Sequence, residues 1–129
     1  MKEIKRDLQK VLEEKIGSGK VLILIGPRQV GKTTLLRKIL SENFENNSVQ
    51  YWNCDEVEVR KILSEESSSR FKSLIGSSKF IVIDEAQRIQ NIGLKLKILH
   101  DNFPEVQIAV TGSSSLDLSN TINEPLTGR

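Results

Sequence analysis

Short, apolar segments alternate along the chain with longer segments in which apolar residues are spaced as on a helix. Residues 21–25 and 80–83 are entirely apolar, and residues 49–54 and 106–110 are rich in residues that favour sheets. Apolar runs of this length are typical of strands that are covered on both faces, as in a parallel sheet. The pattern therefore predicts four strands in these four segments.

The other segments predict helices, because their apolar residues recur at intervals of three and four. The predicted helices are 2–16, a stretch from about residue 32, one broken or two short helices in 56–76, a stretch from Ile89 to Phe103 that ends before Pro104, and a short one near 115–121. Strands that alternate with helices predict an α/β fold with a mainly parallel, open sheet. Such sheets bind ligands at the carboxyl ends of their strands.

The composition is that of one soluble globular domain covering residues 1–129. No apolar run reaches the roughly 18 residues that a membrane-spanning helix needs. The charged N-terminus does not resemble a signal peptide, so we expect a cytoplasmic protein without a membrane partner. The single cysteine, Cys54, excludes an internal disulfide. A net charge of +2 gives no argument for a nucleic-acid partner.

A phosphate-binding motif follows the first predicted strand. Gly26 to Thr33 match the pattern G-x-x-x-x-G-K-[ST] between an apolar strand and an amphipathic helix, which is the context that the motif requires. Glycine permits a tight loop whose N–H groups, with those at the start of the helix, face phosphate oxygens. Lys32 is expected to reach the β- and γ-phosphates, and the Thr33 hydroxyl to bind Mg²⁺. The predicted nucleotide-binding residues are Gly26, Pro27, Arg28, Gln29, Val30, Gly31, Lys32, Thr33 and Thr34.

Two carboxylates follow the apolar run 80–83 directly. An aspartate at the end of a strand beside the phosphate loop can hold Mg²⁺ through its water shell, which predicts Asp84 as a metal residue. Glu85 points in another direction and is predicted to take a proton from the attacking water as general base. The alternative is that both residues start a solvated helix, since acidic side chains favour helix N-termini. The phosphate loop, about 50 residues upstream, favours the catalytic interpretation.

The type of nucleotide follows from the two motifs together. A glutamate beside the Mg²⁺ aspartate suits ATPases that activate water from their own sheet, and the N-K-x-D segment with which GTPases usually read guanine is absent from the sequence. ATP with Mg²⁺ is therefore the predicted ligand, and hydrolysis by an ATPase motor or switch domain is the predicted function.

Two alternative functions share the phosphate loop, which cannot choose among them. One is an interaction or regulatory module that binds nucleotide without turnover and has no need for Glu85. The other is a small-molecule kinase, for whose substrate lid the Ser-rich segment 56–76 is short.

Four segments resemble the AAA-type branch of P-loop ATPases, and most of all a prokaryotic family of uncharacterised ATPases that add a C-terminal domain of unknown function. The segments are 25–34, 83–87, 110–114 and 126–129. This resemblance implies a P-loop three-layer sandwich with strand order 2-3-4-1 and a fifth strand beside the first. It also implies that Thr111 or Ser113 senses the γ-phosphate, and that Arg129 acts as a γ-phosphate contact or arginine finger.

The resemblance also implies parts that we do not expect in this chain. In the family, the fifth strand and a lid follow the position of Arg129, so we expect a truncated ATPase domain that lacks both and has slow turnover. Without a fifth strand, residues 21–25 would form an exposed apolar edge. Such edges pair with other chains, which predicts self-association as a homo-oligomer through this strand, or its cover by some other segment.

Overall fold

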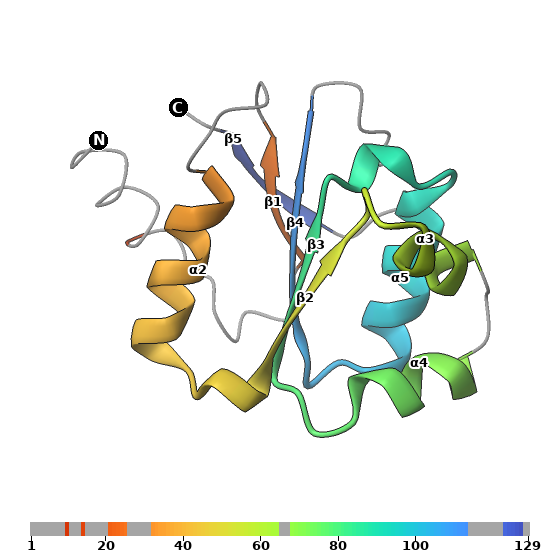
Figure 1. Ribbon diagram of the computed structural model, residues 1–129, viewed down its shortest axis with the longest axis horizontal. Coiled ribbons are helices and arrows are strands. Elements are labelled where there is room, and N and C mark those ends of the chain that lie inside the picture. Colours follow the sequence, from red (N-terminus) through yellow and green to blue (C-terminus); the bar gives the residue numbers. More distant parts are fainter. Residues whose placement is uncertain are drawn as a thin grey trace.

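A computed structural model describes residues 21–25, 32–64, 68–113 and 123–127, together with Lys10 and Glu14. The described strands form one five-stranded sheet in the order β2-β3-β4-β1-β5, and all neighbouring strands run parallel (Figure 1). Their bounds are Val21–Ile25 for β1, Val49–Asn53 for β2, Phe80–Asp84 for β3, Gln107–Gly112 for β4 and Asn123–Thr127 for β5. The predicted order of the first four strands, 2-3-4-1, is confirmed.

The fifth strand is present, so the prediction that it is missing was wrong. β5 pairs with β1 along its length, from Val21 beside Asn123 to Ile25 beside Thr127. The segment escaped prediction because Asn-Glu-Pro-Leu-Thr has no apolar run. Pro125 has no backbone N–H to donate, but it is tolerated because β5 is an edge strand. β1 therefore has a neighbour on both sides, and the expected self-association through an exposed β1 edge loses its basis.

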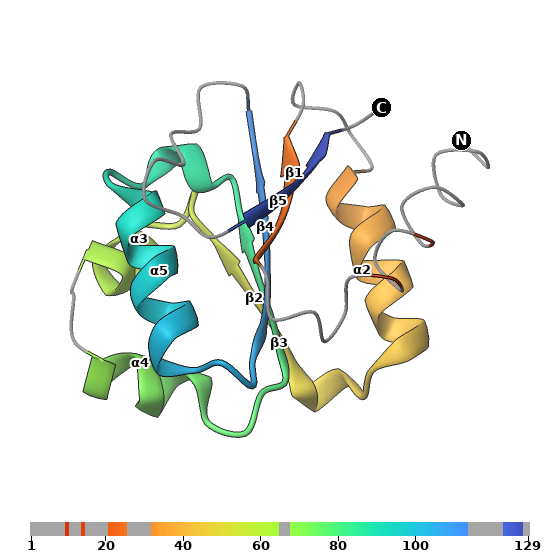
Figure 2. The same ribbon diagram turned by 180° about the vertical axis from the view of Figure 1, so that it is seen from behind.

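Helices cover both faces of the sheet and produce the predicted three-layer sandwich. The helices are α2 (Lys32–Asn43), α3 (Val57–Ser64), α4 (Ser68–Ile75) and α5 (Ile92–Asn102), with 3-10 turns at Asn46–Ser48 and Ala86–Arg88. α2 lies on one face, and α3, α4 and α5 lie on the other (Figure 1 and Figure 2). None of these described helices has the length and apolar character needed to cross a membrane.

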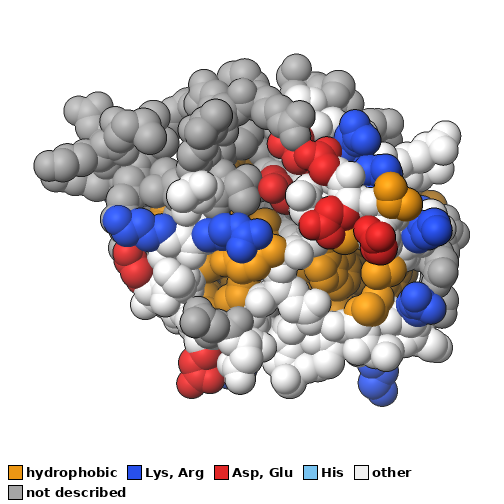
Figure 3. Space-filling view, in the orientation of Figure 1, with side chains coloured by type: hydrophobic (Ala, Val, Ile, Leu, Met, Phe, Trp, Pro, Cys, Tyr) orange, Lys and Arg blue, Asp and Glu red, His pale blue; other side chains and the backbone are white. Residues whose placement is uncertain are grey.

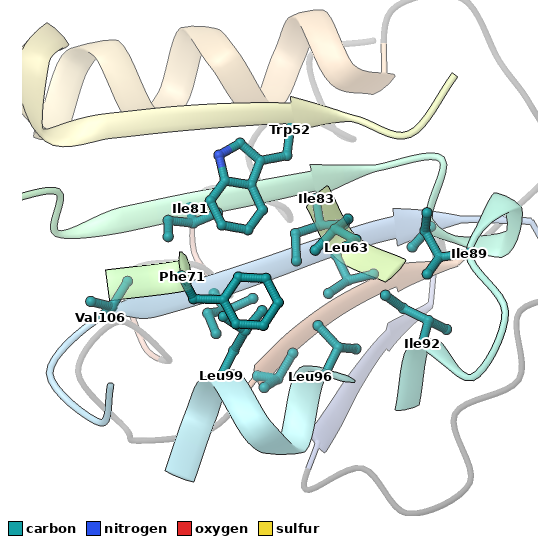
Figure 4. Close-up of a cluster of buried hydrophobic side chains, with 14 of the residues drawn as sticks. Trp52, Leu63, Phe71, Ile81, Ile83, Ile89, Ile92, Leu96, Leu99 and Val106 are labelled. Atoms are coloured by element: carbon teal, nitrogen blue, oxygen red, sulfur yellow. The ribbon is translucent and has the colours of Figure 1, made fainter. Parts of the chain in front are cut away.

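Alternation of side chains along the strands divides the core into two clusters. Ile81 and Ile83 of β3 belong to the larger cluster, on the side of α3 to α5, whereas Phe80 and Val82 belong to the smaller one, on the side of α2. The larger cluster contains Trp52, Leu63, Phe71, Ile89, Ile92, Leu96 and Leu99 (Figure 4), and the smaller one contains Leu36, Ile39 and Leu40. The four β3 residues are fully buried, as an apolar strand between two helical layers requires.

Several predicted boundaries shift, and two of the shifts bear on the polar end of the sheet. The helix predicted from Ile89 begins only at Ile92, because Asn91 has left-handed backbone angles, with φ of 57°, and separates Ile89 from the helix. β4 continues beyond its predicted end to Gly112, so Thr111 is part of the sheet and not of a turn after it. The predicted helices over 2–16, apart from Lys10 and Glu14, and near 115–121 lie outside the described residues.

Candidate nucleotide site

Three strand ends that precede polar residues lie side by side at one edge of the sheet. β4 lies between β1 and β3, and Ile25 at the end of β1 pairs with Gly112 of β4. Because all strands are parallel, their carboxyl ends share this edge, which is the upper one in Figure 1. The phosphate-binding motif begins directly after β1, β3 ends at Asp84 with Glu85 directly after it, and β4 ends at Gly112 with Ser113 directly after it. One edge therefore joins the three predicted groups.

The phosphate-binding motif spans the connection from β1 to α2. β1 ends at Ile25, directly before the motif, and α2 begins at Lys32, as the motif requires of the elements on its two sides. Thr34 is exposed on the first turn of α2. The predicted residues outside the described part are Gly26, Pro27, Arg28, Gln29, Val30, Gly31 and Arg129, together with the side chains of Lys32 and Thr33. Their roles stay predictions.

α2 is fixed to the sheet by a charged contact as well as by its apolar face. The Arg37 guanidinium lies 3.8 Å from the centre of the Tyr51 ring on β2, within the range of a cation–π interaction. Burial raises the pKa of Tyr51, although the Arg37 charge acts in the opposite direction. The helix that follows the phosphate-binding motif is thus held against the sheet at its β2 edge.

The Thr111 side chain ties the end of β4 to the end of β3. Its hydroxyl donates a hydrogen bond to Asp84 Oδ1 and accepts one from the backbone N–H of Glu85 at 3.2 Å. Thr111 is only 1% exposed, so bulk water cannot replace these two partners. A hydroxyl can donate one hydrogen bond, and here the acceptor is Asp84. Thr111 therefore positions both members of the acidic pair.

Glu85 lies at a sharp bend directly after β3. Its φ of 57° and ψ of 45° fall in the left-handed region, which is uncommon for residues other than glycine. Such a conformation costs on the order of 1–3 kcal/mol and persists where neighbours hold it, as Thr111 does here. Only the short 3-10 turn Ala86–Arg88 follows, so the acidic pair does not begin an α-helix.

Gln87 joins the ends of β3 and β4 a second time. Its Nε2 donates a hydrogen bond to Glu85 Oε2 at 2.7 Å, and its Oε1 accepts one from the backbone N–H of Ser113 at 3.2 Å. The sequence pattern predicts no role for Gln87, because the contact depends on the left-handed bend at Glu85. The feature of the sequence that could have indicated Gln87 is its amide, two positions after the predicted base, because an amide can donate and accept hydrogen bonds at once.

Acidic side chains gather over the carboxyl ends of β2 and β3 (Figure 3). The acidic residues at these two ends are Asp55, Glu56, Glu58, Asp84 and Glu85. Among the described residues, no group of three or more His, Cys, Asp or Glu side chains could hold a metal ion. A cation at Asp84 would therefore take its other ligands from elsewhere, as Mg²⁺ does when it combines one or two carboxylates with phosphates and water.

Cys54 lies beneath this acidic edge, directly after β2. Its side chain is fully buried, and its backbone N–H donates to the Asp84 carbonyl at 2.9 Å. Burial, followed by the Asp84 and Asp55 carboxylates, raises the pKa of the Cys54 thiol to about 12, while Arg60 acts in the opposite direction. The thiol is therefore a neutral core group and not a nucleophile.

Solved structures share this fold. A chain in the structure of Drosophila ORC bound to DNA matches with a TM-score of 0.63 over 97% of this chain and 90% of that chain, at 14% identity. The Pif1 helicase from Candida albicans matches with a TM-score of 0.55 over 92% of this chain and 38% of that chain, at 17% identity. At these identities the likeness concerns the fold alone.

Sequence relatives are longer, uncharacterised proteins. One from Mycobacterium tuberculosis is 32% identical over 126 residues, and one from Methanocaldococcus jannaschii is 30% identical over 130 residues. The matches cover 97% and 99% of this chain but 27% and 28% of the relatives, so the chain spans about a quarter of their length. A family model described as an AAA domain matches residues 18–129. The chain therefore belongs to the AAA domain family and is a nucleotide-binding domain of the P-loop ATPase type.

Proposed function

We propose that this chain binds ATP with Mg²⁺ at the carboxyl edge of the sheet and that the full-length protein hydrolyses the ATP as a motor or switch. The observation that carries the proposal is the attachment of Asp84 and Glu85 to Thr111, on the strand next to the one that leads into the phosphate-binding motif. Groups suited to phosphate, metal ion and water thereby meet at one edge.

Thr33 and Asp84 would hold the Mg²⁺ ion. Both supply oxygen ligands, which Mg²⁺ prefers, and the Asp84 carboxylate is half-buried and oriented by the Thr111 hydroxyl. When bound, Mg²⁺ neutralises the charge that develops on the transferred phosphoryl group. Lys32 would pair with the β- and γ-phosphates.

Of the two candidate γ-phosphate contacts on β4, we favour Ser113. The Thr111 hydroxyl donates its one hydrogen bond to Asp84 and accepts one from the Glu85 N–H, so it is not free to donate to a phosphate oxygen. Ser113 is half-buried and lies directly after the last residue of β4. Thr111 is then a positioning residue, and Arg129 stays the candidate for a second γ-phosphate contact or an arginine finger.

The described helices between β2 and β3 do not form a substrate lid of the kind that the kinase alternative needs. α3 and α4 pack against the sheet through Leu63 and Phe71, both fully buried, and do not stand over the site. The acidic surface around β2 and β3 also repels a DNA backbone, so we propose no nucleic-acid partner there.

ATP with Mg²⁺ is expected to raise the melting temperature, because a ligand at 100 times its dissociation constant adds about 2.7 kcal/mol to the free energy of unfolding. Lys32→Ala should remove most of this shift, since it deletes the charge that pairs with the phosphates. Lys38→Ala, on the exposed side of the same helix, is the matched control and should keep it. A Lys32→Ala protein that binds ATP as tightly as the wild type would show that the motif is not the site.

Glu85→Gln is expected to keep ATP binding and lower turnover of the full-length protein by about 10²–10⁴-fold, the usual contribution of a general base. Asp84→Asn should instead weaken the Mg²⁺-dependent part of binding. Glu58→Gln, an exposed glutamate of α3, is the control. Single-turnover assays with labelled ATP measure the rates. Equal turnover in Glu85→Gln and wild type would favour a nucleotide-binding module without hydrolysis.

A further inference from the structure

We propose that Gln87 is a positioning residue that aligns the Glu85 carboxylate with the tip of β4. The general base and the Ser113 backbone would then move as one unit. This inference rests on the proposed function, because it concerns the same site.

Glu85 is attached to β4 through its backbone and also through its side chain. The first attachment joins the backbone N–H of Glu85 to the Thr111 side chain, and the second runs from the Glu85 carboxylate through Gln87 to the backbone N–H of Ser113. The first bond fixes only the main chain. A glutamate side chain has three rotatable bonds beyond it, so the carboxylate needs a contact of its own to keep one direction.

The Gln87 amide supplies this contact with both of its polar atoms. Nε2 donates to Glu85 Oε2 at 2.7 Å, which restricts the directions that the carboxylate and its second oxygen can take. Oε1 accepts from Ser113 at 3.2 Å, so that Gln87 cannot rotate without losing this bond. A displacement of Ser113 is thereby passed on to the group that would accept the proton from water.

The size of the effect follows from the geometry of proton transfer. A base must lie within hydrogen-bond reach of the attacking water, and a misplacement of about 1 Å can cost on the order of 10²-fold in rate. Loss of the Gln87 bridge should therefore lower kcat and leave the affinity for ATP largely unchanged. A purely structural role would lower the melting temperature without this separation of kcat from KM.

The test uses three variants of the protein. Gln87→Met keeps the length of the side chain and removes the amide. Gln87→Glu keeps an acceptor for the Ser113 N–H but places a second carboxylate against Glu85. Gln90→Met, an exposed glutamine in the next turn, is the matched control. The readouts are kcat and KM for ATP with Mg²⁺, the melting temperature, and the hydrogen-exchange rate of the Ser113 amide in the nucleotide-free protein.

We expect Gln87→Met to lower kcat by about 10- to 100-fold with KM within about threefold of the wild type. The Ser113 amide should exchange about tenfold faster, since its acceptor is lost. Gln87→Glu should lower kcat at least as much while Ser113 keeps its protection. In a Glu85→Gln background, Gln87→Met should have no further effect on turnover, because both changes act through the same group.

Unchanged or increased kcat in both Gln87 variants would overturn the inference, as would unchanged Ser113 exchange in Gln87→Met. If Gln87→Met does not fold, Gln87→Glu decides alone, through kcat. Failure of the proposed function looks different. The wild type would then show no ATP turnover, or its turnover would not depend on Glu85. Turnover that Glu85→Gln stops and Gln87→Glu leaves intact would overturn only the role of Gln87.

Discussion

Thr111 shows how one small side chain can decide the geometry of a site at the residue scale. A buried hydroxyl that donates to Asp84 and accepts from the Glu85 N–H satisfies two groups that belong to another strand. Together these bonds hold Glu85 in a left-handed backbone conformation, which few residues other than glycine adopt without support. The side chain is therefore as much a part of the fold as of the site.

Thr111→Val is expected to lower the free energy of unfolding by about 1–3 kcal/mol, because valine has a similar shape but lacks the buried hydroxyl that bonds to both Asp84 and Glu85. Thr111→Ser keeps the hydroxyl and should lose much less. Ser113→Ala should leave stability nearly unchanged and reduce turnover. Urea denaturation with parallel turnover assays measures all three. Equal stability of Thr111→Val and the wild type would contradict the positioning role.

The relation between β1 and β5 matters most at the element scale. β1 precedes the phosphate-binding motif and lies between β4 and β5, so its backbone groups are paired on both sides. The motif is thus attached to a strand inside the sheet. β5 shields an apolar strand that would otherwise be able to pair with another chain.

Removal of residues 123–129 is expected to expose the β1 edge and cause self-association that increases with protein concentration. Removal of only residues 128 and 129 leaves β5 in place and is the matched control. Light scattering across a concentration series distinguishes the two. A shortened chain that stays monomeric at all concentrations would mean that β5 does not protect β1.

The sequence allowed the first four strands to be predicted because each is an apolar or sheet-favouring run between helical patterns. β5 could not be predicted this way, since an edge strand needs less apolar character and Pro125 argues against a strand. At the site, residue types and spacing predicted Asp84 and Glu85. The role of Gln87 depends on a backbone bend, which residue spacing alone does not show.

On the scale of the whole molecule, the stability of the fold depends on a titratable group that is buried in the core. Cys54 belongs to the larger cluster and is fully buried. Its raised pKa means that the folded state keeps the thiol proton at pH values where the unfolded chain releases it. The thiol therefore links global stability to alkaline pH.

Stability is expected to fall as pH rises from about 9.0, the ordinary pKa of the thiol, to about 12, its pKa in the fold. Below this window the contribution of Cys54 is fully present. The slope from this group reaches about 1.36 kcal/mol per pH unit. In Cys54→Ala, the free energy of unfolding should fall less steeply with pH in the same range. Some dependence remains, because this variant keeps Tyr51, whose raised pKa acts in the same direction. Denaturation at several pH values gives the difference; identical slopes would contradict it.

The pairing of β1 with β5 also has a mechanical consequence. The chain enters β1 at Val21 and leaves β5 at Thr127, and because the strands are parallel these points lie at opposite ends of the pair. Tension between the two flanks would pull the strands along each other, loading all the hydrogen bonds between them at once and not one after another. A strand pair loaded in this way resists separation more than one whose hydrogen bonds break one after another, so β1 and β5 would hold the sheet together under tension.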